Sequence, residues 1–332
     1  MDEKTAEGAL KAGRAGGMGE ILEVEGPHEI GPLGRALAEL AENRPEIVGL
    51  TADMGRFSDI HPFRDAYPDR FFQVGMAEAD LLLIAAGLAK TGKIAYCTSY
   101  SAFITRRALD FLIIACAHSK ANVKILAGMP GLMNPYGATH QATDDIAVLR
   151  MIPDLAIIDP CDATELAQVV KAIADVDGTV YVRSLRGKVP VVLDPEKYTF
   201  EFGRAQQLRA GSHVGVISTG FMTQRALVAA AAAEERGVSA GVLHVSTLKP
   251  FDAEAVLRFA SSFDRLVIAE NHQMSGGLAT LVVEALYDEG IQVPTIKIGI
   301  QHRFHEAGSQ AYMEAKYGLD QTRITRAVVD GI

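Results

Sequence analysis

Short apolar segments rich in Val, Ile and Leu alternate with segments of helical spacing along most of the chain, and this alternation limits the fold more than any other feature. In the first half, the strand-like segments are 46–53, 69–75, 93–99, 122–128, 155–160 and 179–184. The segments with helical spacing are 32–43, 79–92, 104–119, 140–152 and 163–175. Apolar strands separated by helices are typical of a parallel sheet that helices cover on both faces.

The alternation stops in a stretch with prolines and charges, 188–210, and then restarts. The later strand-like segments are 213–220, 239–247, 265–271 and 293–299, with helical segments at 223–237, 253–262 and 277–290. We therefore predict an α/β protein with two doubly wound domains, each a largely parallel sheet flanked by helices. The expected boundaries are a flexible lead-in at 1–30, a first domain at 31–190, a linker at 191–208 and a second domain at 209–332.

Composition excludes several classes of function. The net charge of −9 argues against a nucleic-acid partner. The sequence contains no apolar run of the roughly 20 residues that a membrane helix needs, and its N-terminus lacks the apolar core of a signal peptide. Its three cysteines are scattered without metal-binding spacing, which suits a reducing compartment. We expect no metal ligands in this chain. The cytoplasm is the expected location.

Ligands of open parallel sheets bind beyond the carboxyl ends of the strands, so the residues after each strand are the candidate site. These residues are Asp53 and Ser58, Glu78, Tyr100 and Phe103, Tyr136 and His140, and Arg183 and Arg186. A carboxylate, aromatic rings, a histidine and arginines at one edge indicate a polar, aromatic-lined site with an anion-binding rim.

Each of these residues also has a purely structural interpretation. Glu78 opens a helical segment, where a carboxylate favours the helix N-terminus. Phe103 fits a hydrophobic core, and His140 fits the start of a helix. Arg186 fits a solvated turn. The functional interpretation depends on all of these residues together, because several independent strand ends supply side chains that can react with or bind a ligand.

Several motifs, in this order, resemble one family. The first-half motifs are "VGMAEADLLLIAAGLA", "TSYSAFITRR", "PYGATHQATDDIAVLRMIPDLAIIDPCDATE" and "YVRSLRGKVPV"; those of the second half are "VSTLKPFD", "ENHQMSGGL" and "FHEAGSQAYMEAKYGLD". The first series resembles the pyrimidine-binding domain of transketolases and the related 1-deoxyxylulose-phosphate synthases, and the second resembles their carboxy-terminal domain. The resemblance implies the thiamin diphosphate-binding fold followed by the transketolase C-terminal fold.

The resemblance implies roles in binding thiamine diphosphate. Glu78, in the pattern "GMAE", would share a proton with a ring nitrogen of the aminopyrimidine and so promote loss of the thiazolium C–H proton. A carboxyl group held in an apolar setting is suited to such proton exchange. Phe103 would stack on the pyrimidine, with Tyr100 as a second aromatic residue of the pocket. Asp53 would lie near the cofactor.

Other positions correspond to substrate contacts. His140, in "ATHQ", would contact the sugar oxygens and stabilise the covalent intermediate, and Arg186 would hold a substrate phosphate through its planar fork. Tyr136 and Pro135 replace an acidic pair of transketolases, which weakens the case for ordinary sugar phosphates. Tyr136 and Ser58 are therefore expected on the substrate side of the site. His272, in "ENHQMSGGL", is expected to be structural, in a turn where glycines permit close packing.

One expected motif is missing from the sequence. Thiamine diphosphate is anchored through Mg²⁺ by a "GDG" motif followed by a downstream asparagine, and "GDG" does not occur here. The resemblance therefore implies the second, or beta, subunit of a split transketolase. An alpha subunit would bind the diphosphate and Mg²⁺, the two chains would share the cofactor, and α2β2 would be the smallest symmetric assembly.

Three functions remain open at this stage. The first is transfer of a two-carbon ketol unit from a ketose to an aldehyde, with sugar-phosphate-like substrates. The second is the beta subunit of a 2-oxoacid dehydrogenase, which would need a lipoyl-carrying partner but no phosphate-binding Arg186. The third is a non-catalytic scaffold, which the presence of Glu78 disfavours. The joint presence of "THQ" and "RGKVP" favours the first.

Overall fold

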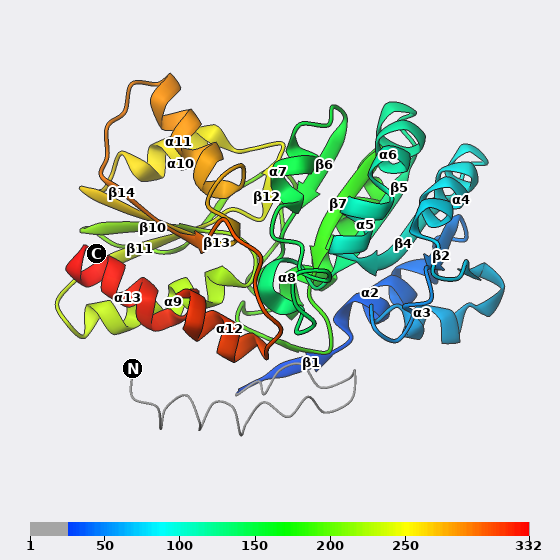
Figure 1. Ribbon diagram of the computed structural model, residues 1–332, viewed down its shortest axis with the longest axis horizontal. Helices are drawn as coiled ribbons and strands as arrows, with labels where there is room; N and C mark the ends of the chain where they lie inside the picture. Colours follow the sequence, from blue (N-terminus) through cyan, green and yellow to red (C-terminus); the bar gives the residue numbers. More distant parts are fainter. Residues whose placement is uncertain (1–25, 332) are drawn as a thin grey trace.

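The protein contains two main sheets that lie side by side (Figure 1). A computed structural model describes residues 26–331, so the predicted lead-in falls outside the described residues for 1–25. The first sheet contains, in spatial order, β12 (Thr247–Lys249), β6 (Leu155–Ile158), β7 (Thr179–Ser184), β5 (Val123–Gly128), β4 (Ile94–Tyr100), β2 (Ile47–Thr51) and β3 (Phe71–Gln73). All of these strands pair in parallel except β12, which is antiparallel to β6.

Helices cover both faces of this sheet because successive strand residues point to opposite sides. Tyr96 belongs to one core, with α2 (Pro32–Ala41) and α8 (Ala163–Ala172), and its hydroxyl donates to the Val170 carbonyl at 2.8 Å. The next residue, Cys97, belongs to the other core. That second core includes α4 (Glu78–Lys90), α5 (Ser101–Arg107) and α7 (Asp145–Arg150).

The second sheet repeats this plan. Its spatial order is β14 (Thr295–Ile300), β13 (Arg265–Gln273), β10 (Val214–Ser218), β11 (Ala240–His244) and β9 (Gln206–Arg209), and only β9 is antiparallel to its neighbour. Helices α9 (Met222–Glu234) and α13 (Gln321–Asp330) cover one face, and α10 (Ala253–Ala260) and α11 (Leu278–Asp288) cover the other (Figure 1). Helix α12 (Gln310–Tyr317) precedes α13. The predicted two-part, largely parallel α/β architecture is confirmed.

The structure differs from the sequence prediction in several short elements. The helix predicted over 104–119 is divided into α5, α6 (Leu109–Phe111) and a π-helical segment η2 (Leu112–His118). The division occurs at Ala108, whose φ of −121° and ψ of 16° are not helical. The helix predicted over 140–152 is shorter and begins only at Asp145, so His140 lies in a loop.

Other short elements occupy the predicted boundaries. Strand β1 (His28–Ile30), in the predicted lead-in, pairs with β8 (Lys188–Pro190), and α3 (His61–Ala66) follows β2. Residues 191–205 of the predicted linker contain turns but neither helix nor strand, and residues 206–208 belong to β9. No helix among residues 26–331 is long and apolar enough to cross a membrane.

A buried ionic cluster joins the two halves. Arg183, at the end of β7, donates from Nε to Asp145 at 2.9 Å and from Nη1 to Asp159 at 2.7 Å. Its Nη2 also donates to the carbonyl oxygen of Asn271, in β13 of the second sheet, at 2.9 Å. All four residues are at most 2% exposed. Arg183 therefore belongs to the interior between the sheets rather than to an open site at the sheet edge.

Candidate active site

Glu78 is the first residue of α4, directly after the loop that follows β3. Only 6% of its side chain is exposed, and its Oε1 accepts a hydrogen bond from Arg107 Nη1 at 3.2 Å. The sequence therefore places a nearly buried acid at a sheet edge, where it is held by a single cation.

Four rings form a continuous row beside this acid. Phe103, on α5, lies 5.7 Å from Tyr100 and 5.1 Å from His140, centroid to centroid. Tyr136 lies 5.5 Å from His140 in an edge-on arrangement. The Arg107 guanidinium lies 3.9 Å from the centroid of Phe103. The structure thus brings together four of the residues singled out in the sequence, two at or after the end of β4 and two after β5.

His140 is neutral at physiological pH. Burial lowers its pKa below the ordinary value of 6.5, and the charge of Arg107 lowers the pKa further. Its Nδ1 lies 2.8 Å from the Thr139 hydroxyl, which leaves Nε2 for another partner. A neutral imidazole beside an aromatic ring is able both to donate and to accept a hydrogen bond.

Arg106 fixes the loop that carries His140. Its Nη1 donates to the carbonyl of Ala138 at 3.0 Å, and its Nη2 donates to the carbonyl of Gln141 at 2.9 Å. The same Nη2 pairs with Asp144 at 3.0 Å. One guanidinium therefore holds the loop on both sides of the histidine.

Arg186 supplies a buried cation next to the Tyr100 hydroxyl. Its side chain donates from Nη1 to the Tyr100 hydroxyl at 3.2 Å and lies 6.0 Å from the Phe57 ring centroid. Asp59 accepts a hydrogen bond from the Gly187 N–H, and burial raises the pKa of its carboxyl although Arg186 opposes this. A guanidinium held in this way is suited to binding an anion.

Two other predicted residues, Asp53 and Ser58, form hydrogen bonds with residues outside the ring cluster. Asp53 is exposed and pairs with Gln73, which donates from Nε2 at 2.9 Å and accepts from the Asp53 N–H at 2.7 Å. Ser58 is buried, and its hydroxyl lies 2.7 Å from both the Met54 carbonyl and the Thr98 hydroxyl. Within residues 26–331, neither Asp53 nor Ser58 has a side-chain hydrogen bond to a residue of the ring cluster.

His272, expected to be structural, is fully buried between the two halves. Its Nδ1 donates to the Gln273 carbonyl at 2.7 Å, and its Nε2 accepts from the N–H of Ala147, in α7, at 3.3 Å. Burial lowers its pKa, so the ring is neutral. A Cβ at Gly277 would lie 2.0 Å from Glu270 Oε2, which shows why this turn needs glycine. These contacts favour a packing role for His272.

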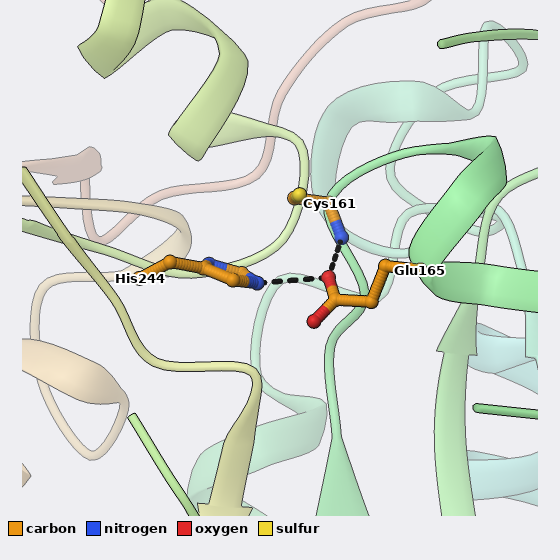
Figure 2. A group of neighbouring side chains, drawn as sticks. All are labelled: Cys161, Glu165 and His244. Carbon is orange, nitrogen blue, oxygen red and sulfur yellow. Dashed lines mark hydrogen bonds and ion pairs between the residues drawn. The ribbon is translucent and has the colours of Figure 1, made fainter. Parts of the chain in front are cut away.

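Cys161, Glu165 and His244 form a second cluster, whose potential ligand atoms lie within 4.8 Å of one another (Figure 2). Glu165 Oε2 already accepts from the Cys161 N–H at 2.6 Å and lies 2.8 Å from His244 Nε2. Glu165 Oε1 accepts from the Tyr198 hydroxyl at 2.5 Å. Burial raises the pKa of the Cys161 thiol well above its ordinary value, which keeps it protonated and a poor ligand. The cluster is better explained as a hydrogen-bonded connection between domains than as a metal centre.

Sequence reasoning missed Arg107, although it contacts both Glu78 and Phe103. The available signal was the pair of arginines at the end of "SAFITRR", the second of them four residues beyond the aromatic residue. That spacing places Arg107 on the same helical face as Phe103.

Comparison with known families agrees with this arrangement. The model of the transketolase pyrimidine-binding domain matches residues 32–191, and that of the transketolase C-terminal domain matches residues 203–324. A transketolase family protein of Sinorhizobium fredii, y4mN, is 44% identical over 93% of this chain and 90% of its own length. The chain belongs to the transketolase family. Enzymes of this family use thiamine diphosphate.

Other relatives are pieces of split enzymes. The 6-deoxy-6-sulfo-D-fructose transketolase subunit SqwH of a Clostridium species is 38% identical over 88% of this chain and 90% of its own length. One of the subunits of the apulose-4-phosphate transketolase of Phocaeicola vulgatus is 35% identical over 89% of this chain and 94% of its own length. A solved split-gene transketolase, an inactive beta4 tetramer, is 37% identical with a TM-score of 0.83, over 91% of this chain and 97% of that one.

Proposed function

We propose that this chain is the beta subunit of a two-chain transketolase that transfers a two-carbon ketol unit from a ketose to an aldehyde with thiamine diphosphate. The observation that carries the proposal is the meeting of the Glu78 carboxylate, the Phe103 ring and the neutral His140 at one sheet edge. When bound, the cofactor would supply a nucleophilic thiazolium carbon. The chain's own residues would orient the pyrimidine and exchange protons with it.

The residues present fit an aminopyrimidine. The group now held between Glu78 and Phe103 is a guanidinium, which is planar, donates hydrogen bonds and stacks on aromatic rings. An aminopyrimidine has the same properties. In this arrangement Glu78 would hold a proton at a ring nitrogen, Phe103 would cover one ring face, and Tyr100 would extend the wall.

The proposed partner is an alpha subunit that supplies the diphosphate and Mg²⁺ site, in an α2β2 assembly. The sequence of this chain has no "GDG" motif for that task. Helix α4 and the η2 segment expose Leu83 (43%), Ile84 (41%) and Ile114 (57%). Apolar side chains grouped on neighbouring helical segments are typical of subunit interfaces.

The proposed substrates carry an anionic group, most simply a phosphate. Arg186 is 5% exposed and contacts Tyr100, so a phosphate or sulfonate at this end would gain a charge-assisted hydrogen bond. Tyr136, which is 41% exposed and packs against His140, replaces a carboxylate that would read sugar hydroxyls. The named substrates of two relatives, a sulfosugar and a sugar phosphate, are both anionic.

Glu78→Gln in the reconstituted two-chain enzyme tests the proposal. The partner is first isolated from native lysate with the tagged chain, and ketol transfer is measured over a panel of phosphorylated ketoses and aldehydes. We expect turnover to fall about 100-fold or more, as loss of a positioned proton-transfer group does. The matched control is Glu254→Gln, which changes the same charge at an exposed position on α10. Near-normal turnover of the Glu78 variant would refute the assignment.

A further inference from the structure

Arg107 occupies the surface that the proposed function assigns to the pyrimidine. Its Nη1 lies 3.2 Å from Glu78 Oε1, and its Cζ lies 3.9 Å from the centroid of the Phe103 ring. These are the carboxylate and the ring face that an aminopyrimidine would use. One ring face cannot stack on two groups at once, so the arginine and the cofactor exclude each other.

We propose that Arg107 is an internal placeholder, which covers Glu78 and Phe103 in the cofactor-free chain and swings into solvent when the pyrimidine binds. The inference rests on the proposed function and adds that Arg107 competes with the cofactor for Glu78 and Phe103. Arg107 would set the affinity for thiamine diphosphate without contacting the cofactor in the loaded enzyme.

The surroundings of Arg107 are suited to such a movement. Its side chain is 55% exposed, so the guanidinium can be solvated once it leaves Glu78. Its neighbour Arg106 differs, because that side chain makes three contacts to the loop that carries His140. Glu78, in contrast, is 6% exposed and would be an unpaired, nearly buried charge without a cation or a ligand.

The size of the effect follows from a two-state competition. The apparent dissociation constant of the cofactor equals its intrinsic value divided by the fraction of protein in the open form, in which Arg107 has left Glu78 and Phe103. A partly exposed ion pair and a partly exposed cation–π contact together favour the closed form by about tenfold. Removing the placeholder should therefore tighten cofactor binding by about the same factor.

The test is calorimetric titration of the assembled two-chain protein with thiamine diphosphate and Mg²⁺, which measures binding without turnover. We expect Arg107→Ala to bind the cofactor about tenfold more tightly than the unchanged protein. Arg107→Lys retains the charge but loses the planar stack, so its affinity should lie between the two. Arg258→Ala, which removes the same charge from an exposed ion pair on α10, should leave the affinity unchanged.

The outcomes separate the two proposals. Equal affinity of the Arg107→Ala variant and the unchanged protein would overturn the placeholder. Weaker binding would also overturn it, because Arg107 would then hold the cofactor rather than give way to it. In both cases the proposed function would stand. Absence of binding by the unchanged two-chain protein would refute the proposed function, and the placeholder with it.

Discussion

Glu165→Gln tests the buried pair that joins the two domains (Figure 2). Burial opposes ionisation of Glu165, but the charge of His244 and hydrogen bonds from His244, the Tyr198 hydroxyl and the Cys161 N–H lower its pKa to about 2. Burial also opposes ionisation of His244, but the Glu165 carboxylate raises the pKa of that imidazole above 6.5. The pair is therefore charged in the folded protein at pH values between the two folded pKa values.

The pKa values give both the size and the pH range of the effect. A carboxyl whose pKa falls from 4.5 to about 2 stabilises the fold by about 3 kcal/mol above pH 4.5, and this contribution is lost as the pH falls towards 2. The contribution of His244 is complete below pH 6.5 and is lost as the pH rises through its raised folded pKa. Both contributions are present together between about pH 4.5 and 6.5. Glutamine keeps the shape but not the charge, so the free energy of unfolding should fall by about 3 kcal/mol in this range.

Urea unfolding followed by circular dichroism, at about pH 5.5 and about pH 8.5, measures this loss. We expect a larger difference between Glu165→Gln and the unchanged protein at the lower pH, where His244 is charged. The matched control is Glu306→Gln, which removes a carboxylate that pairs with Lys316 at the surface, where solvent screens the pair. A loss no larger than that of the control, or one that is the same at both pH values, would refute the reasoning.

Two further substitutions test the substrate side of the site. Arg186→Ala should raise the KM of phosphorylated substrates by about tenfold or more and change that of unphosphorylated analogues far less, because a charge-assisted hydrogen bond is lost. Steady-state kinetics on matched substrate pairs measures this, and equal changes would mean that Arg186 is structural. Tyr136→Asp should increase kcat/KM for ordinary sugar phosphates, because it adds an acceptor for sugar hydroxyls beside His140. Unchanged substrate ratios would exclude Tyr136 from selectivity.

The regular elements of the fold were predictable because the local amino-acid composition indicates which segments are buried. Strand β5 is apolar except for Lys124, and α4 follows directly from "LLLIAAGLA". Strand β12 was not predictable as a separate element, because its three residues gain their structure by pairing Thr247 with Ile158 of the first domain. The helix predicted over 104–119 was too long because apolar periodicity continues unchanged through the break at Ala108.

The same distinction applies to the candidate site: residues identified by the local sequence were predictable, and contacts between distant segments were not. The strand-end rule found Glu78, Phe103 and His140, because each follows a strand that composition identifies. The rule did not find the contact of Arg107 with Glu78, which joins the end of α5 to the start of α4. Successive helical residues point about 100° apart, so the adjacent arginines serve different partners: Arg106 fixes the His140 loop, and Arg107 covers the acid. Two identical neighbours in the sequence therefore act on different parts of the site, and the relative position of α5, α4 and the His140 loop determines which part each one contacts.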